Sequence, residues 1–411
     1  MQRTQLRKDY NGKVMNVKAD KVIHIVVATG EWGQDQLRYR RHRLAEFLAK
    51  QKATKQVIWV YPSENVSSDS FTQLGNGIKQ FAVKDFLKKK IFRFARYQDF
   101  FYQKKLIPLL QWLNTNAQDN KVCLWYTFPG FPGLSSLYHW DQVIYDCSDL
   151  WTAPISGKQS LLLQFRQKII FEAENRIIKA ANTVFCTSDY LYDNIMNRLK
   201  GEEKPVFTIE NGVEYDVFAL NDEKADILNG RDGTVLGFIG GIKPKLDFKL
   251  VKETAETNKD WIFLFVGPDG TNGDPDFKEL LQLDNVIWTG PVAPADVPAY
   301  MNVIDIGIMP YKPSPYNNAV FPLKLFEFLA SGKPVVGVNL PSTKKVEKKH
   351  IYRHLSESDP THFTAVCEEL ERSHHNPIHM KDRKDMAREK DWQKLLQEIY
   401  NKIKLDQKQI I

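Results

Sequence analysis

The segment formed by residues 305–336 constrains the fold more than any other part of the chain. It begins with an apolar run typical of a buried strand, passes through a loop and a short helical pattern over residues 322–331, and ends in a second apolar run. Proline suits the first turn of a helix, because its missing N–H would be unpaired there, and Gly332 followed by Pro334 stops the helix. The segment therefore predicts two strands of an α/β domain joined by a helix.

This helix is also a candidate anion site. Its free N–H groups and the positive end of its dipole would face the preceding loop, and Lys324 and Glu327 lie in the helix itself. A phosphorylated ligand fits that description. The alternative is a helix of an α/β domain that is started by proline and stopped by glycine without any ligand.

Strand and helix patterns alternate along most of the chain. Apolar runs typical of strands occur at residues 22–29, 56–61, 121–127, 143–146 and 183–186, and again at 234–239, 261–266, 286–288, 304–309 and 335–338. Helical patterns lie between several of them, near residues 36–50, 97–114 and 160–181. The rhythm predicts two parallel sheets covered on both faces, and 411 residues suffice for two domains.

The four cysteines have no paired metal spacing, and most lie in apolar runs, so we expect buried thiols in a reducing compartment. No signal peptide or transmembrane run is recognisable. These features predict a cytoplasmic location, with the inner face of the plasma membrane as a possible site of attachment.

Charge is distributed unevenly along the chain. Residues 1–200 contain 30 Lys and Arg against 17 Asp and Glu, a net +13, whereas residues 201–411 contain 27 against 33, a net −6. Residues 79–97 interleave basic residues with Phe, Leu, Ile and Tyr. This pattern is typical of a segment that lies on an anionic membrane surface, and we predict that role for it. The alternative is a core-packed helix with a solvated basic face. No recognisable nucleic-acid module accompanies the charge, so nucleic acid is not an expected partner.

A family resemblance centres on the helix described first. The donor-binding segment of retaining GT-B glycosyltransferases of family 4 is similar to the residues Pro322, Lys324, Glu327, Ala330, Gly332, Lys333, Pro334, Val335 and Val336. The resemblance implies that Glu327 accepts hydrogen bonds from the ribose of a nucleotide sugar, while the preceding loop wraps the diphosphate. The family usually carries a second Glu eight residues earlier, where this chain has Ala319.

Two further segments resemble the same family and place the domain boundaries. Residues 207–218 contain an Asn-Gly turn and resemble the family's entry to the C-terminal domain, and residues 391–403 resemble its terminal helix, which crosses back to the first domain. The resemblance implies an N-terminal acceptor-binding domain of residues 1–205, a C-terminal donor-binding domain of residues 206–385, and a returning helix within residues 386–411. The ligand would lie in the cleft between two Rossmann-like, doubly wound domains.

The predicted donor site also includes a glycine pair. Gly240 and Gly241 end an apolar strand, where backbone can approach a phosphate closely. Relatives carry an Arg and a Lys for the diphosphate where this chain has Gly241 and Leu246, so Lys243, Lys245 and Lys324 are the candidate cations. The predicted donor-binding set is Gly240, Gly241, Lys243, Phe321, Pro322, Lys324 and Glu327.

The predicted acceptor side lies in the first domain. Asp146 and Asp149 follow a strand, where a carboxylate can accept the proton of an acceptor hydroxyl, although either could instead cap a helix. We predict Asp146, Asp149 and Lys324 as catalytic residues. The loop after the first strand and the start of the next helix supply the candidate acceptor-binding residues Gly30, Glu31, Trp32 and Arg38.

No metal or cofactor is expected. Asp274 and Asp276 have the carboxylate spacing of metal-dependent glycosyltransferases, but they lie in a Gly/Pro/Asn-rich segment where a turn explains them better. The sequence thus predicts a metal-independent retaining glycosyltransferase that moves a sugar from a nucleotide-diphosphate sugar to a cell-surface polysaccharide acceptor, as in teichuronic acid biosynthesis. The alternatives are a nucleotide-sugar epimerase of GT-B fold and a catalytically weak nucleotide-sugar-binding scaffold.

Overall fold

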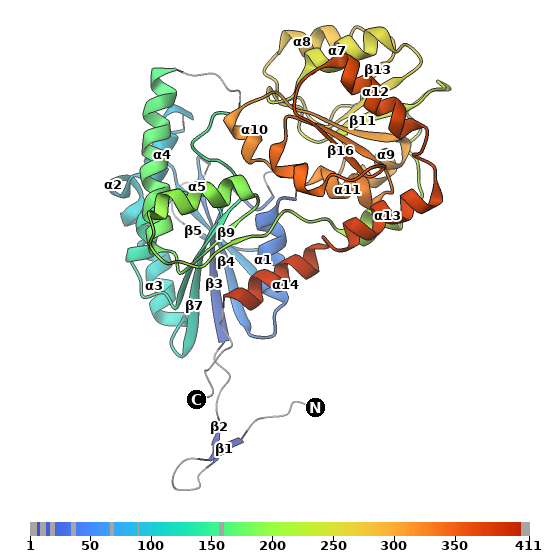
Figure 1. Ribbon diagram of the computed structural model, residues 1–411. Coiled ribbons are helices and arrows are strands. Elements are labelled where there is room, and N and C mark those ends of the chain that lie inside the picture. The colour runs from blue at the N-terminus through green and yellow to red at the C-terminus, as the bar shows by residue number, and fades with distance from the viewer. Residues whose placement is uncertain are drawn as a thin grey trace.

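The computed structural model describes residues 6–8, 14–16, 21–33, 38–65, 70–88, 90–155 and 160–403. Figure 1 shows two α/β domains side by side, the first coloured blue to green and the second yellow to red. Each is built on a parallel sheet with helices on both faces, which confirms the predicted pair of doubly wound domains. A short antiparallel pair, β1 (Leu6–Lys8) and β2 (Val14–Asn16), precedes them.

The sheet of the N-terminal domain has eight strands, of which only β5 runs antiparallel to its neighbour. In spatial order they are β10 (Val206–Thr208), β9 (Thr183–Cys186), β8 (Gln142–Cys147), β7 (Asn120–Tyr126), β3 (Lys21–Val27), β4 (Thr54–Ser63), β6 (Ile78–Lys84) and β5 (Ser70–Gln73). The inner strands are buried on both faces, so they read as continuous apolar runs.

Helices cover both faces of this sheet. The apolar sides of α1 (Arg40–Lys50) and α14 (Trp392–Lys402) pack on one face, around Trp59 and Trp125. The other face is covered by α3 (Ile107–Asn116), α4 (Leu161–Ala180) and α5 (Asp189–Leu199). Shorter elements complete the domain: η1 (Lys90–Tyr97), α2 (Asp99–Tyr102), η2 (Gln103–Leu106) and η3 (Pro132–Ser136).

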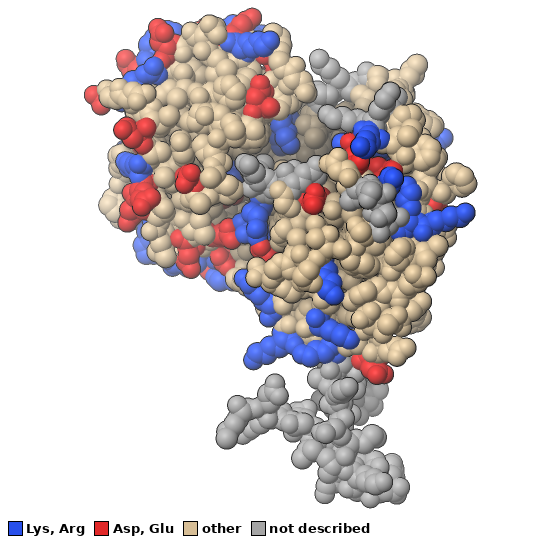
Figure 2. Space-filling model, turned by 180° about the vertical axis from the view of Figure 1, so that it is seen from behind, with Lys and Arg blue, Asp and Glu red and all other residues tan. Residues whose placement is uncertain are grey.

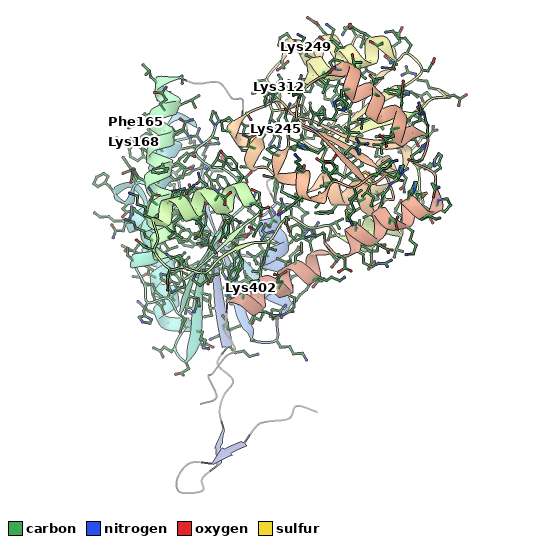
Figure 3. The ribbon with its side chains drawn as sticks, viewed as in Figure 1. Phe165, Lys168, Lys245, Lys249, Lys312 and Lys402 are labelled. Atoms are coloured by element: carbon green, nitrogen blue, oxygen red, sulfur yellow. The ribbon has the colours of Figure 1, made fainter. Side chains whose placement is uncertain are left out.

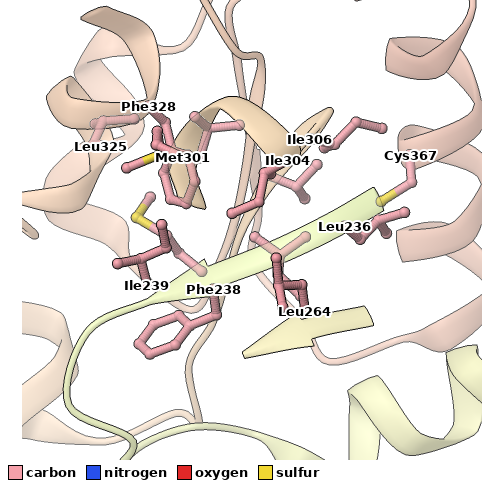
Figure 4. Close-up of a cluster of buried hydrophobic side chains, with 14 of the residues drawn as sticks. Leu236, Phe238, Ile239, Leu264, Met301, Ile304, Ile306, Leu325, Phe328 and Cys367 are labelled. Carbon is pink, nitrogen blue, oxygen red and sulfur yellow. The ribbon is translucent and has the colours of Figure 1, made fainter. Parts of the chain in front are cut away.

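The C-terminal domain has a six-stranded, wholly parallel sheet. Its strands in spatial order are β13 (Val286–Trp288), β12 (Ile262–Val266), β11 (Val235–Ile239), β14 (Ile306–Pro310), β15 (Val335–Val338) and β16 (Tyr352–Leu355). Its helices are α6 (Tyr215–Ala219), α7 (Phe248–Thr257), α8 (Pro275–Leu280), α9 (Val297–Val303), α10 (Pro315–Ala319), α11 (Lys324–Ala330), η4 (Pro341–Val346), α12 (Pro360–Glu371) and α13 (Pro377–Arg388). Figure 4 shows its core, in which Leu325 and Phe328 of α11 pack near Ile239 of β11.

The basic and aromatic residues 79–97 do not form the single segment that the sequence predicted, but divide into two parts. Their first part is β6, which pairs with β4 and β5 and buries Phe81, Ala82 and Val83, so it is neither a helix nor a membrane-facing segment. Pairing with β4 on one edge and β5 on the other outweighs the local charge pattern. The second part is η1; Lys89 lies outside the described residues.

Two predicted helices also differ in extent. The pattern over residues 97–114 is divided among α2, η2 and α3, with Pro108 in the first turn of α3. The pattern over residues 36–50 is helical from Arg40, and residue 36 lies outside the described residues. The four cysteines are buried free thiols, as predicted. Within the described residues, no helix combines the length and the apolar character needed to cross a bilayer.

Candidate functional site

The helix that the sequence singled out is α11, and the core fixes its position. Leu325 and Phe328 are fully buried, and Phe328 lies over Gly307 of β14, where a Cβ would come within 2.6 Å of its ring. The helix ends in a Schellman motif: Gly332, at φ +75°, donates to Leu329 O at 2.9 Å, and Lys333 N donates to Phe328 O at 2.9 Å. The predicted glycine stop is therefore correct.

The glycine pair lies where β11 ends, opposite the start of α11. Gly240 has φ +140°, in the region that favours glycine, and donates its N–H to Val266 O at 2.8 Å. A Cβ at Gly240 would lie 3.5 Å from Lys324 Cε, and one at Gly241 would lie 3.3 Å from Lys243 Cε. Two lysines thus flank the glycine pair, although the usual Arg and Lys positions carry Gly241 and Leu246.

Glu327 lies in strongly basic surroundings. Lys324 Nζ donates to Glu327 Oε2 at 2.6 Å, one helical turn away, and the Glu327 side chain is 15% exposed. Arg43 of α1 in the other domain is close enough for its guanidinium to interact with both Glu327 and Glu214, and it pairs directly with Glu214. Burial lowers the pKa of Arg43, and these two carboxylates oppose that shift. The predicted ribose-binding carboxylate is thus held by Lys324 between the two domains.

The residues before α11 bind the domains together. Phe321 and Pro322 are buried, and Phe321 O accepts a hydrogen bond of 2.7 Å from Asn211 Nδ2 in the predicted boundary turn. Ala319 packs within the hydrophobic core of the N-terminal domain, and its carbonyl accepts a 2.8 Å hydrogen bond from Ser188 Oγ. Ala319 therefore occupies a domain contact, where a glutamate would bring a charge into apolar surroundings.

The two predicted catalytic aspartates have different environments. Asp146 receives both bonds of a buried ion pair: Arg40 Nε lies 3.0 Å from Oδ1 and 2.9 Å from Oδ2, and both side chains are at most 4% exposed. Arg40 Nη1 also donates to Glu210 O at 2.9 Å. Asp146 therefore has a structural role. Together with Arg40 it joins α1 to β8 and to the segment that leads to the second domain.

Asp149 faces the other domain. It accepts hydrogen bonds from Tyr316 Oη at 3.0 Å and from Ser148 Oγ at 3.2 Å. Burial raises the pKa of Asp149, while the Tyr316 hydrogen bond and the charge of Lys245 oppose the shift. A carboxylate with a raised pKa at a domain boundary is suited to exchange a proton with an acceptor hydroxyl.

Lys245 completes this cross-domain cluster, which consists of Asp149, Lys245, Tyr311 and Tyr316. Its Nζ lies 5.0 Å from the ring centroid of Tyr311 and 5.6 Å from that of Tyr316, beside α10 where the domains meet (Figure 3). Burial lowers the pKa of Lys245 to about 8, and the charge of Asp149 opposes that shift. The sequence named Lys245 as a possible phosphate ligand but carried no signal for the tyrosines, because 167 residues separate Tyr316 from Asp149.

The candidate acceptor loop after β3 lies over β4 and β6. Gly30 O accepts a 2.9 Å hydrogen bond from Trp59 Nε1, and Glu31 Oε1 accepts one of 3.3 Å from Gln80 Nε2. The Trp32 ring meets that of Trp59 edge-on, with centroids 4.9 Å apart. The Arg38 guanidinium lies 5.7 Å from the Trp32 ring centroid and pairs with Glu46. The structure thus brings Gly30, Glu31, Trp32 and Arg38 together.

Buried ionisable groups support this loop. Burial raises the pKa of Tyr61 to about 12, and Glu31 adds to the shift. His42, stacked on Trp59 at 5.0 Å, has its pKa lowered to about 3, first by burial and then by Arg41 and Arg38. The imidazole is therefore neutral at physiological pH and serves as a packing surface for Trp32.

Metal-ligating side chains converge at one place among the described residues, formed by Asp305, His374 and His375. Asp305 Oδ2 already accepts from Val235 N at 2.9 Å, and His374 Nδ1 contacts Glu371 O.

Asp274 caps α8 by accepting from Asp276 N at 3.0 Å and from Phe277 N at 3.4 Å, so that carboxylate has a local structural role.

Comparison with known proteins gives concordant matches. The sequence pattern of the family described as glycosyl transferases group 1 matches residues 233–372. The protein TuaH of Bacillus subtilis (strain 168), described by name as a teichuronic acid biosynthesis glycosyltransferase, is 58% identical to this chain over 383 residues. These residues are 92% of this chain and 96% of that protein.

Solved structures share the fold at low identity. The sucrose-phosphate synthase of Thermosynechococcus elongatus aligns with a TM-score of 0.70 and 14% identity over 93% of this chain and 98% of its own. Anabaena HepE, solved in complex with UDP and glucose, aligns with a TM-score of 0.63 and 14% identity over 93% of this chain and 99% of its own. At such identities these structures establish the GT-B fold.

Proposed function

Because the chain belongs to the glycosyl transferases of group 1, and is thus a glycosyltransferase of the GT-B fold, we propose that it moves a sugar with retention of configuration from a nucleotide-diphosphate sugar to a hydroxyl of a teichuronic acid-like cell-surface polysaccharide. The B. subtilis relative supports the polysaccharide class, and the HepE complex with UDP and glucose supports a nucleotide-sugar donor. The acceptor would be the growing glycan, presented on a lipid carrier.

The observation that carries the donor proposal is the lysine-flanked glycine pair. Gly240 and Gly241 let the diphosphate approach backbone at the end of β11, while Lys243 and Lys324 supply positive charge on either side. In the reaction the bond between the anomeric carbon and the phosphate oxygen breaks, the nucleoside diphosphate leaves, and the acceptor oxygen bonds to the anomeric carbon on the same face of the sugar. The two lysines and backbone N–H groups at the start of α11 would stabilise the charge that develops on the leaving group.

The acceptor side of the reaction is assigned to the first domain. Asp149, which accepts a hydrogen bond from Tyr316, would take the proton of the attacking hydroxyl as the bond to the sugar forms. The loop with Gly30, Glu31, Trp32 and Arg38 would position the glycan. In this proposal the lysines replace a metal ion, and no cofactor is required.

Thermal shift against UDP, GDP, ADP and their sugars tests the donor assignment, because a ligand of the native state raises the melting temperature. We expect one nucleotide and its sugar to stabilise the protein, and the Lys243→Ala and Lys324→Ala variants to lose most of that shift. Lys259→Ala, at an exposed position just after the C-terminal end of α7, is the control. No stabilisation by any nucleotide would refute the donor proposal.

One observation favours the scaffold alternative. Where the family usually has its second glutamate, this chain has Ala319. This residue is buried against the other domain rather than directed at a sugar. A scaffold would bind donor tightly without turnover, whereas an epimerase would release a free epimer without acceptor. Incubation with radiolabelled donor and isolated cell-wall glycan separates these functions, because only the transferase incorporates label into the glycan.

A further inference from the structure

Five phenylalanines form a continuous cluster at the surface of the N-terminal domain. Ring centroids are 4.7 Å apart for Phe86 and Phe101, 5.4 Å for Phe100 and Phe101, 5.8 Å for Phe94 and Phe101, and 6.3 Å for Phe86 and Phe92. Phe100 is 88% exposed and Phe86 is 48% exposed. We call Phe86, Phe92, Phe94, Phe100 and Phe101 the phenylalanine cluster. A contiguous and exposed aromatic surface of this kind indicates an interaction site.

The start of α4 exposes a second apolar group. Leu161, Leu162 and Phe165 are 85%, 60% and 61% exposed, whereas from Ile170 onward the helix buries one side in the domain core. Phe165 and Lys168 project outward from α4, away from the second domain (Figure 3). The first two turns therefore carry large apolar side chains that fold stability does not require.

Polar contacts fix these two groups to one another. Arg166 of α4 interacts with Tyr97 at the end of η1, and Arg176 of α4 pairs with Asp99 of α2 at 2.6 Å. Phe100 follows Asp99 directly. Arg166 and Arg176 are separated by about 15 Å of helix, so the combined surface is extended rather than a single pocket.

The charge of this region is positive. Three of its acids, Glu64, Asp85 and Asp99, are each paired with an arginine, namely Arg93, Arg96 and Arg176 respectively, and Glu172 of α4 is exposed. Lys88, Lys104 and Lys168 are exposed and form no ion pair within the described part of the chain. Figure 2, which shows the molecule from behind, places most acidic side chains on the C-terminal domain instead.

We propose that the phenylalanine cluster and the start of α4 together form a docking surface for an anionic lipid bilayer. Apolar rings would enter the interface while the lysines contact the headgroups. A second copy of this chain fits less well, because a symmetric interface would bring the same lysines opposite one another. The proposal goes beyond sugar transfer and holds whichever acceptor is used.

Co-sedimentation with vesicles tests the surface. Wild type should pellet with vesicles of phosphatidylglycerol and phosphatidylcholine at low salt, and much less with phosphatidylcholine alone or at high salt. The triple variant Phe100→Ser, Leu161→Ser, Phe165→Ser should bind at least about tenfold more weakly. The control is Leu220→Ser with Ile378→Ser, which removes side chains that are 73% and 69% exposed on the other domain, and it should bind as wild type.

A second variant tests the charge separately. Lys88→Gln, Lys104→Gln and Lys168→Gln together should weaken binding to anionic vesicles by about a hundredfold and leave the melting temperature unchanged. Equal sedimentation of wild type and both triple variants would overturn the proposal. So would a wild-type dimer in solution that the serine variant converts to monomer. Nucleotide thermal shift should be the same in all variants, so a failure of membrane binding is distinct from a failure of the donor site.

Discussion

The hydroxyl of Tyr316, in the C-terminal domain, donates a 3.0 Å hydrogen bond to the carboxylate of Asp149, in the N-terminal domain. The bond spans the boundary between the two sheets at the point where donor and acceptor would meet. The bond therefore forms only when the domains are closed, and it then holds the carboxylate that we assign to proton transfer.

The first prediction concerns this bond. Tyr316→Phe removes one hydrogen bond to a charged group and should weaken the closed arrangement by about 1.5 to 3 kcal/mol. We expect a lower rate of sugar transfer with little change in secondary structure. Tyr190→Phe, at an exposed position of α5, is the control. A Tyr316→Phe enzyme with wild-type kinetics would show that the bond does not participate in turnover.

The second prediction concerns Glu327. Glu327→Ala should weaken donor binding by roughly 1.5 to 3 kcal/mol, about ten- to over a hundred-fold, because a charge-assisted hydrogen bond to the ribose would be lost. Isothermal titration calorimetry with the nucleotide found by thermal shift measures the change. Glu279→Ala on the exposed side of α8 should leave it unaffected. Unchanged affinity in a folded Glu327→Ala protein would remove this carboxylate from the site.

The third prediction is a pH dependence of stability that arises from Lys245. Its folded pKa of about 8 lies below the unfolded value of about 10.4. Between these values only the unfolded chain binds the proton, so this group makes the free energy of unfolding rise with pH, and it adds no pH dependence below that window. Denaturant titrations should show wild type gaining stability relative to Lys245→Met from pH 8 to pH 10. A constant difference would contradict the shifted pKa.

The fourth prediction separates a structural from a catalytic role for Asp146. Asp146→Ala leaves the guanidinium of Arg40 buried without its partner and should lower the free energy of unfolding by about 3 to 5 kcal/mol. Arg40→Met combined with Asp146→Leu should recover most of that loss. Denaturant unfolding measures both. Full stability of Asp146→Ala together with lost activity would instead support a direct part in the chemistry.

The fifth prediction concerns the departure at position 319. Ala319→Glu restores the family's residue type, but it would place a carboxylate in the core of the N-terminal domain. We expect a lower melting temperature and no gain in transfer, with Ala319→Gly as the smaller control. Higher transfer activity at unchanged stability would mean that the side chain can turn toward the sugar.

The sequence predicted the elements whose signals are local. Five strands of the first sheet (β3, β4, β7, β8 and β9), β11 to β15 of the second sheet and the glycine stop at Gly332 follow from apolar runs and turn chemistry, whereas β5, β10 and β16 were not predicted. β6 was missed because its lysines and its place in a basic segment concealed a buried strand. The pairing of Arg40 with Asp146, 106 residues apart, and the cluster around Lys245 depend on how two domains meet. No spacing within one segment records such contacts.

The return of α14 to the first domain means that the chain passes between the domains twice, and the two passages are joined. Val213 N donates to Lys390 O at 3.0 Å, and Trp392 N donates to Val213 O at 3.0 Å, so the outgoing and returning segments are hydrogen-bonded side by side. Two tethers fixed together act as one hinge. We therefore expect the two domains to open by rotating about the line of these two segments. A cut in either segment should loosen that rotation, while the other segment still holds the domains together.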